Sequence, residues 1–134
     1  MRALTACVLL AACATAPQPT PPEQVAGCWV NRDAGAVIMR WLPDPGAPGV
    51  LAGVRIAVGI NGQRSERFTL EAEGDGWKLC RAGDGRCWGV ARGDSGSLEG
   101  GRVFIDGAGD SLRIAVAGDG PERVIFQGRR DSCQ

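Results

Sequence analysis

Cysteine is the residue type in this chain with the widest choice of chemistry. The six cysteines stand at positions 7, 13, 28, 80, 87 and 133 of the 134 residues. A thiol can carry a lipid, form a disulfide or act as a nucleophile, and a nucleophile needs an activating base. The chain contains no histidine, so a Ser-His-Asp or Cys-His arrangement cannot form, and imidazole metal sites are excluded. We therefore expect the cysteines to serve attachment and cross-linking, with no catalytic residues, no cofactor and no metal.

Attachment is indicated by the beginning of the chain. Arg2 is followed by an apolar run over residues 3–10, two alanines and Cys13. This order resembles the lipobox of bacterial lipoproteins, here Leu10-Ala11-Ala12-Cys13. The resemblance implies a signal peptide over residues 1–12, cleavage before Cys13, a diacylglycerol on the Cys13 sulfur and a fatty acid such as palmitate on its amine. The run is too short to span a bilayer, which takes about 20 apolar residues.

A tether is predicted over residues 13–26, between the lipid and a domain of residues 27–134. Its proline-rich part favours extended polyproline II, about 3.1 Å per residue. Ala14 stands where aspartate would imply retention at the inner membrane of enteric bacteria, so the lipoprotein resemblance favours the periplasmic face of the outer membrane. In an exported protein, the four cysteines of the domain are expected to form disulfides.

The domain consists of short runs rich in valine, isoleucine and tryptophan, separated by glycine and aspartate. Asn61-Gly62 is typical of a tight hairpin turn. We expect strands over residues 27–31, 36–42, 50–58, 63–71, 77–81, 86–91, 102–106, 111–117 and 122–127. About nine strands without a helix predict an all-β fold, an antiparallel up-and-down barrel, because closure removes exposed edges.

Alternation within the runs predicts which side chains face the core. Val124 and Phe126 are expected on one face of their strand, and Arg123 and Gln127 on the other. The stretch 50–60 is apolar on both faces, so it is either a central strand or the lining of a surface patch.

The same alternation selects one of the three pairings that four cysteines permit. If Trp77 and Leu79 face the core, and Trp88 and Val90 do so on the next strand, the intervening cysteines both face outward. One register then brings 80 opposite 87, 79 opposite 88 and 77 opposite 90. This predicts the disulfide Cys80-Cys87 and leaves Cys28-Cys133 to join the two ends of the domain, which are neighbours in a barrel. Reduced, buried thiols remain the alternative.

Three segments carry a resemblance to a family: Ala26-Gly27-Cys28-Trp29, Met39-Arg40-Trp41-Leu42-Pro43 and Val50-Leu51-Ala52-Gly53-Val54. They resemble an uncharacterised bacterial lipocalin-like domain family over about the first third of the mature domain. Two departures concern polar positions: Met39-Arg40 replaces an acidic residue, and Asp106-Gly107-Ala108-Gly109-Asp110 replaces a histidine-containing turn. The resemblance implies a barrel interior that binds apolar ligands. Its lining would be Trp29, Trp41, Trp77 and Trp88, unless these rings only fill the core.

Other patterns indicate turns or solvated surface. The 15 basic and 15 acidic residues cancel, and no basic stripe suggests a nucleic acid partner. Gly93-Asp94-Ser95-Gly96 matches a serine nucleophile motif but has no histidine base, and the overlapping Arg92-Gly93-Asp94 is a common triplet. Asp106 and Asp110 lack the six to eight oxygens of a calcium site.

The sequence therefore predicts a non-enzymatic lipoprotein that binds a small apolar ligand or serves as an accessory of the cell envelope. A second hypothesis is an inhibitor of a cell-wall hydrolase such as lysozyme, because lipoproteins that inhibit lysozyme are also small disulfide-bonded barrels. Their Ser-Gly-x-x-Tyr signature is absent, since the chain has no tyrosine. A purely structural anchor is the third.

Overall fold

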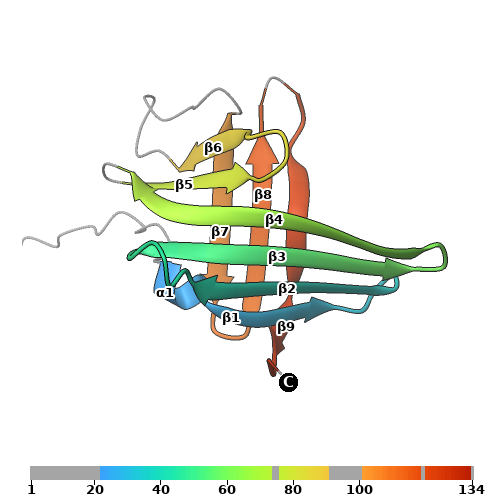
Figure 1. Ribbon diagram of the computed structural model, residues 1–134. Helices are drawn as coiled ribbons and strands as arrows, with labels where there is room; N and C mark the ends of the chain where they lie inside the picture. Colours follow the sequence, from blue (N-terminus) through green and yellow to red (C-terminus); the bar gives the residue numbers. More distant parts are fainter. Residues whose placement is uncertain (1–21, 74–75, 91–100, 119, 134) are drawn as a thin grey trace, which may run out of the picture.

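A computed structural model of the chain describes residues 22–73, 76–90, 101–118 and 120–133. Cys13, the lipobox and the motifs between residues 92 and 96 lie outside these ranges. Within them, nine strands follow a short helix and close into a barrel in chain order, with the last strand paired to the first (Figure 1). This confirms the predicted all-β barrel. The elements are α1 (Pro22–Val25), β1 (Gly27–Asn31), β2 (Ala36–Pro43), β3 (Val50–Gly59), β4 (Gly62–Glu73), β5 (Gly76–Arg81), β6 (Cys87–Val90), β7 (Arg102–Ala108), β8 (Ser111–Ala117) and β9 (Arg123–Asp131).

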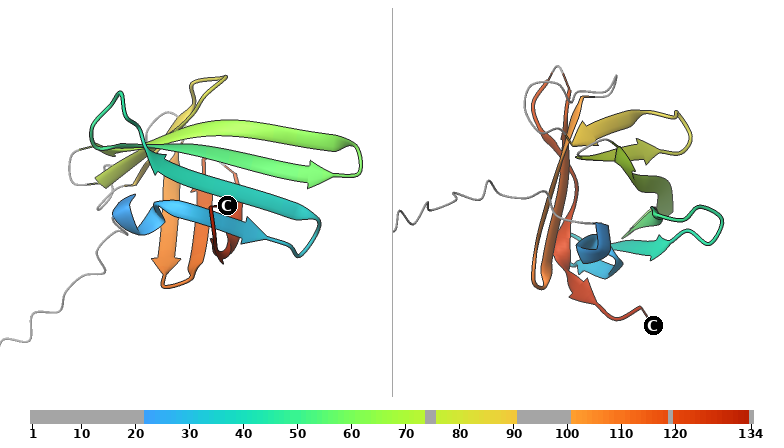
Figure 2. Two further views of the ribbon diagram at one scale, coloured as in Figure 1. Left: turned by 60° about the horizontal axis from the view of Figure 1, so that its bottom comes forward. Right: turned by 90° about the vertical axis from the view of Figure 1, so that its left-hand side faces the viewer.

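The barrel is flattened into two layers of differing strand direction. Strands β1 to β4 run across strands β7 to β9, and the β3–β4 hairpin extends past the other layer (Figures 1 and 2). Side chains from the inner faces of both layers meet in one core, as in orthogonally packed sheets. Its largest fully buried members include Trp29, Trp41, Trp88, Met39 and Leu70.

One pairing differs from the predicted antiparallel meander. Strands β6 and β7 are parallel and share a single registered pair, Gly89 with Arg102. Parallel neighbours cannot be joined by a tight turn and need a longer connection. The chain has eleven residues between Val90 and Arg102, more than a tight hairpin turn needs.

The face assignment predicted for β9 is wrong. The register between β8 and β9 shifts between Ile114 and Ala115, so Phe126 lies opposite Ile114 while Val124 lies opposite Ala115. Phe126 is buried and Val124 is 45% exposed. A β-bulge adds one residue to a strand and reverses the alternation beyond it. Arg123, which was expected to face outward, therefore faces the same side as the buried Val116.

Both predicted disulfides are present. Cys80 and Cys87 lie directly opposite each other, in the register that also pairs Leu79 with Trp88 and Trp77 with Val90. Cys28 bonds Cys133 across 105 residues of sequence. Because β1 and β9 share three registered pairs, the second disulfide adds a covalent bond where the barrel closes.

The folded unit begins before the first strand, at residues that the sequence reading assigned to the tether. Val25 of α1 is fully buried, and its carbonyl accepts a hydrogen bond of 2.8 Å from Trp29 Nε1. Arg130 lies 4.2 Å from the centre of the Trp29 ring and donates a hydrogen bond of 3.2 Å to the carbonyl of Ala26. Arginine near a helix C-terminus satisfies carbonyls that lack partners in the helix. No helix in the described part of the chain is long and apolar enough to cross a membrane.

Candidate functional site

The four tryptophans predicted to line a ligand cup belong to the packed core. Trp29 and Trp41 are fully buried, Trp88 is 1% exposed, and Trp77 packs against the core cluster. A Cβ atom built on Gly53 would lie 2.5 Å from the Trp41 ring, so the backbone of β3 rests directly on that ring. These contacts favour the core-packing alternative for the four rings.

Trp88 nevertheless lies beside charged groups. The guanidinium carbons of Arg81 and Arg86 are each 5.4 Å from the centre of its ring. Both distances fall within the range of a cation–π interaction, which holds a guanidinium against the electron-rich face of an indole. The buried ring therefore anchors two arginines from the β5–β6 turn at the edge of the core.

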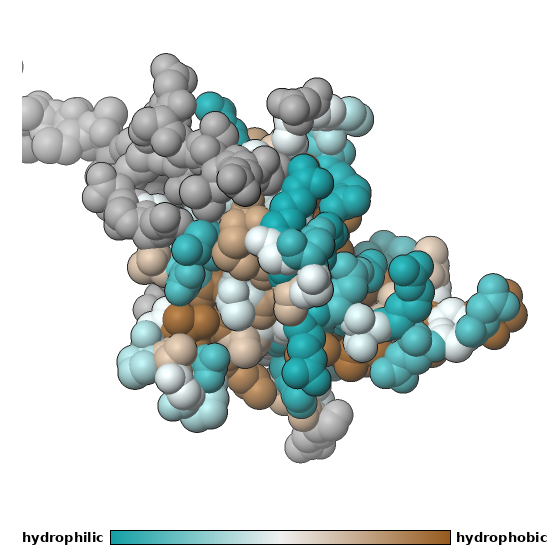
Figure 3. Space-filling view, turned by 45° about the horizontal axis from the view of Figure 1, so that its top comes forward, coloured by the Kyte–Doolittle hydropathy of each residue, from teal (hydrophilic) through white to brown (hydrophobic). Residues whose placement is uncertain are grey.

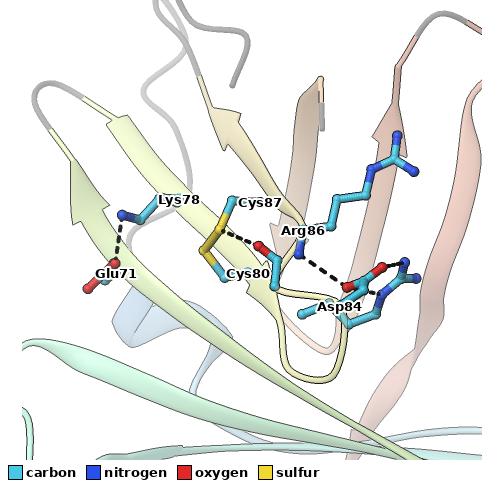
Figure 4. The surroundings of a disulfide bond; sticks show 8 residues. Glu71, Lys78, Cys80, Asp84, Arg86 and Cys87 are labelled. Atoms are coloured by element: carbon cyan, nitrogen blue, oxygen red, sulfur yellow. Dashed lines mark hydrogen bonds and ion pairs between the residues drawn. A yellow bond between two sulfur atoms is a disulfide. The ribbon is translucent and has the colours of Figure 1, made fainter. Parts of the chain in front are cut away.

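Asp84 fixes this turn from the outside (Figure 4). Arg81 donates hydrogen bonds of 3.2 Å and 2.5 Å to its two carboxylate oxygens, and the backbone N–H of Arg86 donates one of 3.1 Å. The hydrogen bond from Arg81 and the one from the Arg86 backbone lower the pKa of Asp84 from 3.8 to about 2. The same contact raises the pKa of Arg81. Figure 4 shows the Arg86 side chain extending from the turn toward the strands of the other layer.

A third arginine enters from β3. Arg55 lies opposite the buried Met39, so its side chain starts on the inner face of the sheet. Its Nε donates a hydrogen bond of 2.9 Å to the carbonyl of Ile125, and its Nη1 lies 3.4 Å from Glu66 Oε1. The contact to Ile125 satisfies the bulged part of β9 and holds the guanidinium between the two layers.

Arg123 connects these groups. It lines one cavity of about 200 Å³ together with Arg55, Glu66 and Arg81. It also lines a second cavity, of about 210 Å³, together with Arg86 and Trp88. Among the described residues, the Arg123 guanidinium has no ion pair and no hydrogen bond. We call the region formed by Arg55, Arg81, Arg86 and Arg123 the arginine cleft.

Two of the arginines in this cleft contact carboxylates: Arg55 contacts Glu66, and Arg81 contacts Asp84. Guanidinium presents several N–H donors in one plane, a geometry that matches carboxylate and phosphate oxygens. Contacts with protein oxygens already orient Arg55 and Arg81, so binding an anion would cost them little side-chain entropy. The arrangement is suited to holding a small oxyanion at Arg123.

Sequence reasoning did not find this cleft, although part of the signal was present. Trp77 and Leu79 were assigned to the inner face, and the same alternation puts Arg81 on that face. Arg55 is the one charged residue in the apolar stretch 50–60. Because both faces of this stretch are apolar, the sequence does not show which face points into the barrel. Alternation predicted Arg123 on the outer face, because the position of a bulge cannot be predicted from alternation.

A separate groove of about 640 Å³, called here the outer groove, lies between the β1–β2 turn and strands β7 to β9. The β1–β2 turn contributes Arg32 and Asp33, and strands β7 to β9 contribute Asp106, Arg113 and Arg129. Asp106 and Asp110, considered above for calcium, are both exposed. In the part of the chain that the structure describes, no three potential metal ligands of the cysteine, aspartate or glutamate type lie together.

Comparison with known proteins adds no assignment. No protein family, no curated protein and no solved structure matches this chain. The lipoprotein and lipocalin-like resemblances therefore stay predictions.

Proposed function

We propose that this chain is a lipid-anchored, non-enzymatic protein of the bacterial cell envelope that binds a small ligand through an anionic group held in the arginine cleft. The observation that carries the proposal is Arg123, a cation without a counter-ion among the described residues, which lines one cavity with Arg55 and a second with Arg86. Arg123 is exposed to solvent, so a dissolved anion can reach it, and the arginines around it add to the positive potential there. A bound phosphate or carboxylate would supply the missing counter-charge.

The ligand class differs from the apolar one expected from the resemblance. The tryptophans fill the interior, while the two cavities that share Arg123 are lined in part by arginines. A ligand with an anionic group fits these cavities better than a wholly apolar molecule. The cavity that contains Arg55 and Arg123 is also lined by Phe68, Val124 and Ile125. These side chains would contact an apolar part of the same ligand.

The test uses the chain from residue 14, because all nine strands, both disulfides and the core residues named above lie after residue 21. Inorganic pyrophosphate and citrate are titrated into the protein, and binding is measured by tryptophan fluorescence and by isothermal titration calorimetry. We expect saturable binding by one or both anions, weakened by added salt because exposed charges are screened. Mass spectrometry of extracts from the purified protein would identify a co-purified ligand.

Arg123→Gln is the diagnostic variant. Loss of a charge-assisted hydrogen bond is expected to weaken anion binding about tenfold or more. Arg129→Gln is the matched control, since it removes the same charge from an exposed arginine of the outer groove. Equal weakening by both variants, or unchanged binding by Arg123→Gln, would refute a specific role for the cleft.

The outer groove supports a second candidate, the inhibitor of a cell-wall hydrolase. Its lining mixes arginines and aspartates over a volume of about 640 Å³, and charged surfaces of both signs steer protein partners and set their orientation. An assay of lysozyme activity with and without the protein tests this candidate. Arg129→Gln, the control above, should weaken any inhibition while leaving anion binding at the cleft unchanged.

The anchor has its own test in the producing cell. Radiolabelled palmitate should mark the protein, and Cys13→Ser should abolish both the label and membrane association. An unlabelled protein whose Cys13→Ser variant matures and localises as before would remove the lipoprotein proposal while leaving the arginine cleft untouched.

A further inference from the structure

The outer face of strands β2 and β3 carries a continuous row of aliphatic side chains. Ile38 lies opposite Ile56, and Ala36 opposite Val58, on the side of the sheet away from the buried Met39 and Trp41. Ile38 is 39% exposed, Leu42 43% and Val58 46%. Both alternatives given for the stretch 50–60 therefore hold: β3 is paired on both sides, with β2 and β4, and its outer face lines a surface patch.

Ile60 extends the row past the barrel. It follows β3 in the turn of the β3–β4 hairpin, and its side chain is completely exposed to solvent. Figure 3 shows hydrophobic surface along this projecting hairpin as far as its end. Contiguous apolar surface on a monomer usually marks a site of contact with a partner or a membrane.

Two arginines lie among the aliphatic side chains of this face. Arg40, Val54 and Arg67 form one cross-strand row on β2, β3 and β4. Among the described residues, neither arginine has an ion pair. Glu66 binds Arg55 on the inner side. Glu71, which shares the outer face of β4 with Arg67, lies 3.0 Å from Lys78 Nζ. The β4 residues next to Arg67 on this face, Ser65 and Thr69, are uncharged.

We propose that this surface, formed by Ile38, Leu42, Val58, Ile60, Arg40 and Arg67 and called here the docking face, rests on an anionic lipid surface. Aliphatic side chains enter the boundary between headgroups and acyl chains, and arginines attract anionic headgroups. A protein partner would have to supply both an apolar and an acidic surface, whereas an anionic bilayer presents both at once. The docking face lies on a different part of the barrel from the arginine cleft and does not depend on the ligand proposed for it.

Docking would also complement the acyl anchor at Cys13, if that anchor is present. Two weak membrane contacts on one chain strengthen each other, because the first raises the effective concentration of the second. The docking face would hold the barrel in one orientation against the bilayer instead of leaving it to rotate on its tether.

The test is vesicle co-sedimentation with the unacylated chain from residue 14. Phosphatidylcholine vesicles are compared with vesicles that also contain phosphatidylglycerol. We expect binding to the anionic vesicles and little to the neutral ones. The combined variant Ile38→Thr, Val58→Thr and Ile60→Ser should reduce binding about tenfold. Threonine keeps the β-branched shape at both strand positions, so the strands should persist.

Two further variants show whether vesicle binding depends on the charges of the docking face and whether it depends on that face at all. Arg40→Gln with Arg67→Gln should remove the preference for anionic vesicles. Phe104→Thr is the matched apolar control: Phe104 is 43% exposed on the outer face of β7, and its loss should leave vesicle binding unchanged. Arg123→Gln should also bind vesicles normally, so failure of the anion proposal and failure of this one are distinguishable.

Three results would overturn the inference. The first is no binding to anionic vesicles, and the second is an equal loss of binding with Phe104→Thr. The third is a wild-type sedimentation coefficient that falls in the triple variant without lipid, because the face would then join two copies of the chain. Near-ultraviolet circular dichroism of the tryptophans shows that each variant is folded before it is tested.

Discussion

The two disulfides are expected to differ in their contribution to stability, and the difference follows from the lengths of chain that they enclose. Cys28 and Cys133 are 105 residues apart, whereas Cys80 and Cys87 are 7 apart. The loss of unfolded-state entropy grows with the logarithm of loop length. It amounts to about 4.7 kcal/mol for the long loop and about 2.5 kcal/mol for the short one. The long-range bond should therefore stabilise the domain by about 2 kcal/mol more.

The structure gives a second reason to expect the larger contribution to stability from Cys28-Cys133. The Cys28 side chain is only 5% exposed, and it lies in the β1–β9 pairing that closes the barrel through three registered pairs. The β5–β6 turn, by contrast, is also held by backbone hydrogen bonds from Arg81 to Arg86 and from Gly85 to Arg81. Loss of Cys80-Cys87 leaves these contacts in place.

The assay compares two double variants, Cys28→Ser with Cys133→Ser and Cys80→Ser with Cys87→Ser, by urea unfolding monitored through tryptophan fluorescence. Free energies of unfolding are obtained by linear extrapolation, and the slopes must agree for the comparison to hold. The variant without the long-range bond should be the less stable one. Equal stability, or a larger loss from the turn disulfide, would refute the reasoning from loop length and closure.

Two further predictions concern packing and charge. Gly53→Ala should destabilise the protein by about 1 to 3 kcal/mol in the same urea assay, because its Cβ would lie 2.5 Å from the Trp41 ring. Gly59→Ala, also in β3 but with nothing within 4 Å of its added Cβ, is the control and should change stability far less. Asp84 should titrate near pH 2 in carboxyl carbon NMR, because the hydrogen bond from Arg81 lowers its pKa from 3.8 to about 2. The stabilisation from this pair should be present above pH 3.8 and be lost as the pH falls through about 2. A midpoint near 3.8, or one that Arg81→Gln does not raise, would contradict the assignment.

The sequence was sufficient to predict those features that depend on residues close together in the chain. Alternating apolar side chains and glycine-rich turns predicted strands such as residues 27–31 and 111–117 with the bounds that the structure has. The parity of Trp77, Leu79 and Cys80 against the following strand predicted a register and, with it, a disulfide. These inferences depend on the period of two along a strand, which tertiary packing reinforces.

Features set by packing between distant segments could not be read in this way. The bulge beside Ala115 puts Arg123 on the same side of the sheet as Val116, and no single residue there predicts a bulge. The parallel pairing of β6 with β7 depends on where a long connection returns. The sequence also presents Arg55 and Arg123 far apart, and only closure of the barrel brings them to a common cavity.

The positions of the arginines connect the fold to the proposed activities. In the cleft, Arg55 and Arg81 point inward and are held by Ile125, Glu66 and Asp84, so their charges are fixed in place before any ligand arrives. On the docking face, Arg40 and Arg67 point outward without ion pairs among the described residues, so they are available to a broad, mobile surface of anionic headgroups. Fixed charges select small anions of matching geometry, whereas exposed charges without ion pairs respond to the charge density of a surface. The cleft should therefore discriminate between pyrophosphate and citrate, while vesicle binding should follow the content of anionic lipid and change little with the identity of the headgroup.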